Sequence, residues 1–491
     1  MTKNLHIDTQ AMRAKILDLA IQGKLTDQRA EDGNAQDLLK EIQAEKEKLI
    51  KEKKIKKEKP LPEITEEEKP FEIPDNWEWV RLGNLTSKVG AGNTPKGGKN
   101  SGVYRESGVE FIREMNVYND GLHYDGMVYI SSELAKTRTG SAVVAGDILL
   151  NITGGSIGRC ALVPDNFVLG NVNQHVLIIR NVVASLREYI HLVLCSPLVQ
   201  RYINNSAVGD KAGLSASKTK GFVIPLPPLA EQKRIADKVS KLFAQLDAID
   251  KAYEEYRELQ QAMKAKLLEL AIQGKLTDQR AEDGNARDLL KAIQTEKEKL
   301  IKEKKIKKEK PLPEIEADEI PFEIPKNWMW ARWGTLSISI KYGYNTSAQK
   351  DGKIKMVRIS DIQNNQVNWD SVPFCNIPKE EIAQYLLRKN DILFARTGGT
   401  VGKSYLVSEV PENVVYAGYL IRTRYSEKLS PQYLKYFMES DLYWSQLKKG
   451  TTTTAQPNCN AKTLGKMVLP LPPLAEQKRI VAKLDELLPL L

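Results

Sequence analysis

Residues 17–64 read LDLAIQGKLTDQRAEDGNAQDLLKEIQAEKEKLIKEKKIKKEKPLPEI, and residues 268–315 repeat this block with 44 of 48 positions identical. A second block, PLPPLAEQKRI, occurs at residues 225–235 and again at residues 470–480. The segments enclosed by these blocks have similar lengths but unlike sequences. The chain therefore consists of two variable modules set in a duplicated frame.

The segment after residue 235 predicts one long helix. Its apolar residues alternate at spacings of four and three, which is typical of a coiled-coil seam. The seam consists of Ile235, Val239, Leu242, Leu246, Ile249, Tyr253, Tyr256, Met263, Leu267 and Leu270. At 1.5 Å per residue the helix would be roughly 54 Å long, too long to be buried in a small domain, so we expect a spacer.

The repeat register places both chain ends on the same seam. A shift of 251 residues aligns the first end with the second half of the seam, through Leu5, Met12, Ile16 and Leu19. A shift of 245 residues aligns the other end with the first half, through Ile480, Leu484, Leu487 and Leu491. We therefore expect the two ends to form a split second copy of the connector, antiparallel to the long helix and related to it by approximate twofold symmetry. The alternative is a homodimeric coiled coil between separate chains.

Both modules predict an α+β fold with a mixed or antiparallel sheet. Each opens with an extended lead-in to a first strand, FEIPDNWEWVRLG at 71–83 and FEIPKNWMWARWG at 322–334. Short β-rich runs follow, with helical patterns near each module's end. GDILLNITGGSIG at 146–158 matches NDILFARTGGTVG at 390–402, a buried strand that turns through a glycine pair. The modules therefore share one fold and differ in their surfaces.

These patterns divide the chain into six segments. They are a half-connector helix (1–22), a charged arm and linker (23–73), the first module (74–225), the long helix with the second arm and linker (226–324), the second module (325–470) and a second half-connector (471–491). The helices of the arms, at 35–58 and 286–309, have narrow apolar stripes and are predicted to be exposed.

Positive charge is concentrated in the modules rather than in the arms. The net charge is +10, and the acidic stretches that follow the two Lys-rich runs cancel them locally. The first module carries +3 and the second +9. Phosphate contacts supply the sequence-independent part of nucleic-acid affinity, so this distribution favours an anionic partner for the modules.

Side chains suited to base readout lie near the shared landmarks. Arginine contacts guanine edges, and asparagine or glutamine contacts adenine, through paired hydrogen bonds in the major groove. The candidates are Arg113, Asn116, Tyr118, Asn119 and Asn151 in the first module, and Arg358, Gln363, Asn364, Asn365 and Arg396 in the second. The glycine pairs Gly154-Gly155 and Gly398-Gly399 are interpreted as permitting tight turns.

Catalytic patterns are not recognisable in the sequence. TGGTVGKS at 397–404 nearly fits a phosphate-binding loop, but it has Thr397 where glycine is required and a strand-like run after Ser404. The tetrapeptides typical of amino-methyltransferases and the G-x-G-x-x-G fingerprint are missing. The four cysteines are far apart and the histidines do not cluster near them, so the sequence indicates neither a disulfide framework nor a metal site. With no secretory signal or membrane-spanning stretch, we expect a cytoplasmic, non-catalytic protein.

The motifs together resemble the specificity subunits of type I restriction-modification enzymes. The resemblance covers essentially the whole chain: two target-recognition domains, each led in by I-P-x-N-W and closed by P-L-P-P-L-A-E-Q-K-R-I, with a long helix ending in L-A-I-Q-G-K-L-T. The N-terminal position of much of the repeated helical region looks like a circular shift of the commoner layout.

This resemblance implies a subunit, present once per complex, that reads a bipartite, asymmetric sequence in double-stranded DNA. Two methyltransferase subunits would supply S-adenosylmethionine and adenine methylation, and restriction subunits would supply ATP- and Mg²⁺-dependent translocation and cleavage; no cofactor is expected on this chain. The alternatives are a free-standing DNA-binding protein, such as a regulator or architectural factor, and a self-sufficient methyltransferase, which the missing motifs disfavour.

Overall fold

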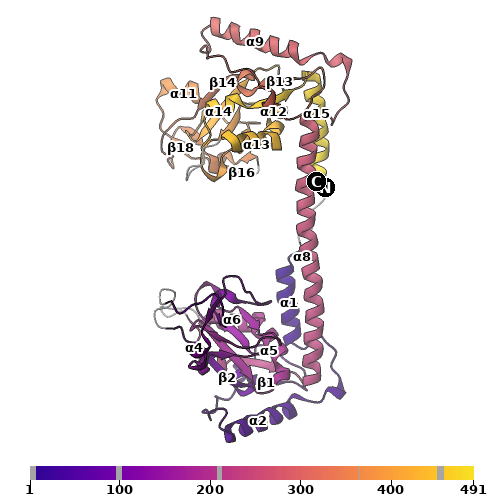
Figure 1. Cartoon of the computed structure of the whole chain (residues 1–491), viewed down its shortest axis with the longest axis vertical. Coiled ribbons are helices and arrows are strands. Elements are labelled where there is room, and N and C mark those ends of the chain that lie inside the picture. The colour runs from indigo at the N-terminus through magenta and orange to yellow at the C-terminus, as the bar shows by residue number, and fades with distance from the viewer. Residues whose placement is uncertain (1–6, 96–101, 207–212, 364, 451–457) are drawn as a thin grey trace. The chain divides into compact units, whose positions relative to one another are not determined.

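The computed structural model describes residues 7–95, 102–206, 213–363, 365–450 and 458–491. The chain forms two compact units, residues 3–253 and residues 254–491, called here the first and second unit. Each unit contains one variable module with its own copy of the frame (Figure 1).

The first module contains two main β-sheets. An antiparallel sheet has the order β2-β11-β8-β9, with bounds Thr86–Ala91, Val176–Asn181, Ile148–Asn151 and Cys160–Leu162. A mixed sheet has the order β6-β3-β10-β7, with bounds Val128–Ile130, Val109–Ile112, Gly170–Val172 and Ala142–Val143. Within it, β3 and β10 are parallel and the other pairs are antiparallel. The interior strand β8 is buried on both faces, as its unbroken apolar run requires.

The second module repeats this arrangement. Its antiparallel sheet has the order β14-β22-β19-β20, with bounds Ser337–Tyr342, Leu420–Tyr425, Ile392–Ala395 and Ser404–Leu406. Its mixed sheet has the order β18-β15-β21, with bounds Phe374–Cys375, Ile354–Val357 and Val414–Tyr416. The predicted α+β fold with mixed and antiparallel sheets is confirmed.

The opening and closing strands of each module pair with each other. In the first module β1 (Glu78–Arg81) is antiparallel to β12 (Val223–Leu226). In the second, β13 (Met329–Arg332) is antiparallel to β23 (Val468–Leu471). Both ends of a module therefore meet at one place, which lets the sequence between them vary without moving the frame.

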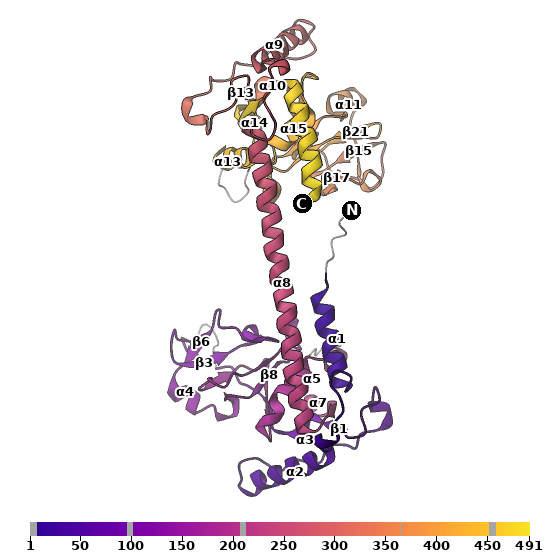
Figure 2. The same ribbon diagram turned by 90° about the vertical axis from the view of Figure 1, so that its right-hand side faces the viewer.

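The long helix is present as α8, which runs for 44 residues from Leu229 to Ile272. In the first unit α1 (Thr9–Ile21) lies alongside it (Figures 1 and 2). The Thr9 hydroxyl donates to Asp250 at 2.7 Å, and the Arg13 guanidinium donates to Asp247 at 2.7 Å. Rising numbers on α1 thus meet falling numbers on α8, which confirms antiparallel packing in this unit.

In the second unit α15 (Leu474–Leu487) packs on the other half of α8. Ile480 and Leu484 belong to the same buried cluster as Leu268 and Ala271 of α8. The predicted seam is buried at its start, through Ile235, Val239 and Leu246. At its other end Leu267 and Leu270 are half-buried.

The middle of the seam is more exposed than its ends. Ile249, Tyr256 and Met263 are each more than one-third exposed, because the described parts of α1 and α15 cover the outer portions of α8. Leu5 lies outside the described residues, and the closeness of the two chain ends stays a prediction. In the described part of the chain, no helix is both long and apolar enough to cross a membrane.

A buried glutamate joins three of the repeated motifs in each unit. In the first unit the carboxylate of Glu231, which is 0% exposed, accepts hydrogen bonds from Trp77 Nε1 at 2.8 Å, Gln28 Nε2 at 2.7 Å and Thr26 Oγ1 at 3.0 Å. These donors come from the N-W and L-T-D-Q motifs, and the acceptor comes from L-A-E-Q-K-R-I. The motifs recur because they are parts of one buried junction.

The second unit repeats this junction around Glu476. Its carboxylate accepts from Trp328 Nε1 at 2.7 Å, Gln279 Nε2 at 2.5 Å and Thr277 Oγ1 at 3.4 Å. Burial raises the pKa of Glu476, although the hydrogen bonds from Trp328 and Gln279 oppose this shift.

An arginine–aspartate pair lies beside each junction. Arg234 donates to both carboxylate oxygens of Asp32 at 2.6 Å, and Arg479 bonds Asp283 in the same way at 2.5 and 2.6 Å. Both aspartates come from the repeated D-Q-R-A-E-D stretch. Each copy of the frame is therefore stabilised by its own arginine–aspartate pair of the same kind.

The charged arms were predicted to be exposed, but their helices are partly buried. The helices α2 (Ala35–Lys51) and α9 (Ala286–Lys302) are shorter than expected. On α2, Leu38 and Ile42 are one turn apart and buried in the core of the first unit, and on α9 Ile293 is buried. A narrow apolar stripe is enough to pack each helix on its unit, because only one side of the helix makes that contact. The Lys-rich stretches beyond the helices are mostly exposed.

Candidate nucleic-acid interface

Both modules carry a glycine loop at the end of a buried strand, with Gly154 and Gly155 exposed in the first and Gly399 exposed in the second. In the first, the loop of residues 153–158 joins β8 to β9; in the second, the loop of residues 397–402 joins β19 to β20. The chain continues as strand β20 after the second loop, whereas a phosphate-binding loop of the nucleotide-binding type leads into a helix. The rejection of a nucleotide site on the sequence pattern agrees with this geometry.

The two glycines of each pair have different reasons to be glycine. Gly154 and Gly398 have φ of 72° and 74°, a left-handed conformation that favours glycine. Gly155 and Gly399 have no positive φ, and a Cβ on either would meet no atom of the described residues within 4 Å. Neither backbone conformation nor packing among the described residues requires glycine there. A partner that approaches the main chain closely would require it.

An aromatic and arginine stack flanks the loop of the first module. Tyr118, in β4 (Val117–Tyr118), stacks on His123 with ring centroids 4.0 Å apart, and the Arg159 guanidinium lies 4.4 Å from the Tyr118 ring centroid. Arg159 directly follows the loop. Exposed Asn119 accepts a hydrogen bond from the Cys160 main-chain nitrogen at 2.9 Å, which fixes this segment against β9.

Two of the predicted contact residues are buried, contrary to the prediction. Asn116 is 0% exposed, and its Nδ2 donates to the His123 carbonyl oxygen at 3.0 Å. Asn151, also 0% exposed, donates from Nδ2 to the Glu114 carbonyl oxygen at 2.8 Å. Neither side chain has surface with which to contact a base, and each stabilises a turn instead. Arg113 is half-buried and donates to the Gly126 carbonyl oxygen at 2.5 Å.

The second module places a different arginine beside its loop. Arg396 directly precedes the loop, and its guanidinium lies 4.7 Å from the ring centroid of Tyr342. Tyr419 is 62% exposed, and its carbonyl oxygen accepts from the Arg396 main-chain nitrogen at 3.1 Å. An arginine–tyrosine pair therefore flanks the loop in each module, but from opposite ends of the loop.

The other predicted residues of the second module lie on separate elements. Arg358 is paired with Asp361 at 2.8 Å, so its guanidinium is partly committed within the module. Gln363 is exposed at the end of β16 (Ile362–Gln363). Asn365 is exposed and its Nδ2 donates to Glu439 at 3.3 Å. Asn364 lies outside the described residues.

Sequence reasoning missed Arg159, His123 and Tyr419 as members of this surface. The flanking position of Arg159 beside the shared glycine loop was a usable signal. His123 follows β5 (Gly121–Leu122) and Tyr419 lies in the turn before β22, so only the fold brings each of them close to its loop.

Comparison with known proteins agrees with this architecture. The family pattern described as "Type I restriction modification DNA specificity domain" matches residues 74–256 and 340–489. The specificity subunits of the type I restriction enzymes EcoAI and EcoEI of Escherichia coli are 28% and 29% identical to this chain, and each match covers 97% of this chain and 88% of the relative.

A structural relative shows the same fold. It is a solved chain described as "Structural basis underlying complex assembly and conformational transition of the type I R-M system". It superposes with a TM-score of 0.56 at 19% identity, covering 85% of this chain and 91% of that chain. The chain belongs to the family of type I restriction-modification specificity subunits.

Proposed function

We propose that this specificity subunit reads a bipartite, asymmetric DNA target, with one half-site per module and with α8 setting the gap. The observation that supports this is the shared glycine loop with its arginine–tyrosine pair on opposite flanks, Arg159 in one module and Arg396 in the other. One fold thus presents its arginine from two different directions. Arginine at a base edge is the commonest specific contact in the major groove, so different half-sites follow from different arginine positions.

The glycine loops would supply the contact common to both half-sites. No contact among the described residues requires glycine at Gly155 or Gly399, and the missing side chain would let a sugar-phosphate backbone approach the main chain closely. Backbone contacts position a protein on the duplex without reading sequence. The module surfaces around the loops would then read the bases.

The partners belong to the same proposal. Two methyltransferase subunits carrying S-adenosylmethionine would methylate adenine, restriction subunits using ATP and Mg²⁺ would cleave, and one copy of this chain in the cytoplasm would direct both. The chain's part in this scheme is to bind and orient DNA.

Module exchange tests the proposal. Residues 74–225 are replaced by the corresponding module of another specificity subunit, and methylated adenines are mapped in a host that supplies the methyltransferase subunit. One half of the recognised sequence should change while the other half and the gap stay the same. A change in both halves would refute the assignment of one half-site to one module.

Helix insertion tests the spacer. Four residues added within the exposed middle of α8 lengthen the helix by about 6 Å and rotate its C-terminal half by roughly 40° relative to its N-terminal half, so the gap should change or recognition should fail. An unaltered target would refute the role of α8. Substitution of four surface residues in the same segment controls for the sequence change without the added length.

A further inference from the structure

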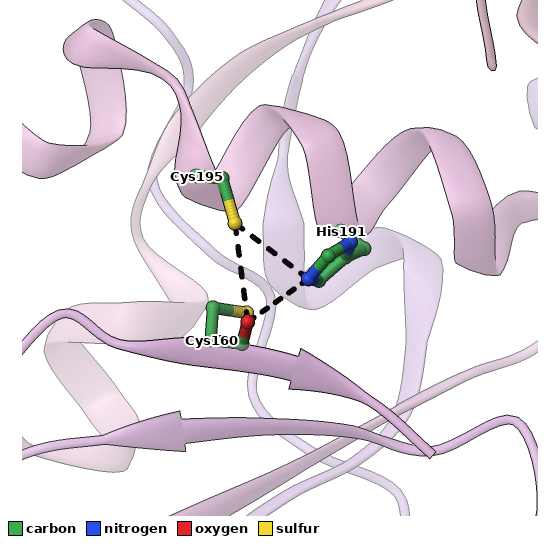
Figure 3. A group of neighbouring side chains, drawn as sticks. All are labelled: Cys160, His191 and Cys195. Atoms are coloured by element: carbon green, nitrogen blue, oxygen red, sulfur yellow. Dashed lines mark hydrogen bonds between the residues drawn. The ribbon is translucent and has the colours of Figure 1, made fainter. Parts of the chain in front are cut away.

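Three side chains in the first module form a compact cluster that the sequence did not predict. Cys160 is the first residue of β9, and His191 and Cys195 lie one turn apart on α5 (Arg187–Cys195) (Figure 3). The two sulfur atoms and an imidazole nitrogen lie within 4.8 Å of one another, and Cys195 Sγ is 3.6 Å from His191 Nε2. The expectation that cysteines and histidines stay apart is wrong here, because the strand brings Cys160 across 31 residues of sequence to His191.

The second module reveals what this position holds in the same fold. The register between the modules is fixed by Tyr189 and Tyr433, whose hydroxyls donate to the carbonyl oxygens of Pro225 at 2.9 Å and Pro470 at 2.7 Å. The strand after each glycine loop gives the same offset. The matched positions are Cys160 with Ser404, His191 with Lys435, and Cys195 with Glu439.

The second module has a cation at this place. Lys435 is buried, and its ammonium group lies 2.7 Å from the Glu439 carboxylate. At the matched positions the first module has an imidazole and two thiols in place of the lysine, glutamate and serine. Cys195 is the last residue of α5, whereas Glu439 lies in the turn after α12 (Pro431–Phe437). As a set the imidazole and the two thiols are the donors that zinc and other borderline-soft ions prefer.

We propose that Cys160, His191 and Cys195 form a binding site for one transition metal ion, with Zn²⁺ as the preferred ion. Tetrahedral zinc with Zn–S of about 2.3 Å and Zn–N of about 2.0 Å separates sulfur from nitrogen by roughly 3.5 Å, which matches the distance between Cys195 Sγ and His191 Nε2. Three protein ligands leave the fourth position to water. Binding deprotonates both thiols, releases their protons to solvent and involves no change of oxidation state.

The surroundings of the cluster suit metal entry and retention. Cys160 is buried, while His191 and Cys195 are half-buried, so the cluster borders solvent on one side. His191 Nε2 lies 2.9 Å from the Cys160 carbonyl oxygen, a contact that it would exchange for the metal ion. The ion would then join α5 to β9 directly behind Arg159 and the glycine loop.

Metal titration of the full chain tests the proposal. After removal of metal with a chelator, Co²⁺ is added under reducing conditions and then displaced with Zn²⁺. We expect one equivalent to bind, with a thiolate-to-cobalt charge-transfer band and the visible bands of a tetrahedral ion, and Zn²⁺ to abolish both. X-ray absorption of the zinc form should show two sulfur neighbours at about 2.3 Å.

The chain supplies its own matched variant. The triple substitution Cys160→Ser, His191→Lys and Cys195→Glu installs the set of side chains found in the second module, so it should fold and lose the bound equivalent. Cys375→Ser, at a buried cysteine of the second module, should leave stoichiometry and spectrum unchanged. Equal binding by the triple variant would overturn the proposal. So would a wild-type chain that binds no metal and whose Cys160 and Cys195 react as free thiols or pair as a disulfide.

Discussion

The two copies of the frame share the same buried side-chain contacts, whereas the two modules share a fold but differ in the side chains around their glycine loops. The buried glutamate junctions at Glu231 and Glu476 accept hydrogen bonds from the same three residue types, and the aspartate pairs beside them repeat within 0.1 Å. Around the glycine loops, by contrast, the arginines come from opposite flanks. Buried polar contacts tolerate little change because an unpaired partner is costly, whereas surface side chains can change freely.

The largest expected effect is on the frame. Glu231→Ala removes the acceptor of three buried or partly buried donors and should destabilise the first unit by roughly 3–4 kcal/mol. Hydrogen exchange resolved along the chain should show faster exchange in residues 3–253 than in the second unit. Glu476→Ala should show the converse.

The control for the frame prediction is Glu188→Ala, an exposed position on α5, which should leave exchange unchanged. Equal destabilisation of both units by Glu231→Ala would mean that the two copies of the frame do not act separately.

The next effect concerns the modules. Arg159→Ala should weaken binding of the assembled complex to its target by roughly 1–3 kcal/mol, or about 5- to 150-fold, and should relax only one half-site. Arg396→Ala should relax the other. Competition binding with DNA altered in one half-site at a time measures this.

Exposed Arg105, which is bridged to Tyr129 of β6 in the mixed sheet and not to the sheet that carries the loop, provides the control. Its replacement by alanine removes the same charge away from the loop and should weaken binding uniformly or not at all. If Arg159→Ala and Arg396→Ala relaxed the same half-site, the comparison between the modules would fail.

A smaller effect on stability, which should depend on pH, is expected when the charged contact between Arg234 and Asp32 is removed. The hydrogen bond from Arg234 lowers the pKa of Asp32 below its ordinary value of 3.8. A carboxyl whose pKa is lower in the folded state stabilises the fold above its unfolded pKa, and this stabilisation disappears as the pH falls through the folded value. Asp32→Asn should therefore cost about 1–2 kcal/mol near pH 6 and progressively less below about pH 4.

Urea unfolding of wild type and Asp32→Asn between about pH 6 and pH 3 checks this prediction. The two stabilities should converge in acid. A constant difference across this range would mean that the aspartate contributes through packing and not through its charge.

The smallest effect is expected at the glycine loops. Gly155→Ala and Gly399→Ala should change stability by less than about 0.5 kcal/mol, because the added methyl group has no atom of the described residues within 4 Å. Affinity for DNA should nevertheless fall for targets of any sequence. Gly154→Ala is the contrasting variant, since its φ of 72° predicts a loss of stability as well. Unaltered affinity in Gly155→Ala would remove the loop from the interface.

Sequence patterns predicted the repeated parts well and the site only partly. The seam of α8 and the antiparallel α1 were predicted from hydrophobic periodicity and from comparison of the repeated segments with each other. The pairing of each module's opening strand with its closing strand was not predicted. Burial of Asn116 and Asn151 was missed, because it depends on how a turn folds back over its strand. The contact between Cys160 and His191 was missed for the same reason, because a contact between segments distant in sequence cannot be seen in the local pattern of either segment.

Duplication of one module within the unchanged frame shows whether each module reads its own half-site. Residues 74–225 are replaced by a copy of residues 325–470, which leaves the frame intact and gives both positions the same reading surface. Mapping methylated adenines in a host with the methyltransferase subunit should then yield two identical half-sites in inverted orientation, separated by the original gap. Retention of the original asymmetric target, or a target with only one specified half, would contradict the account that the frame sets spacing while each module reads its own half-site.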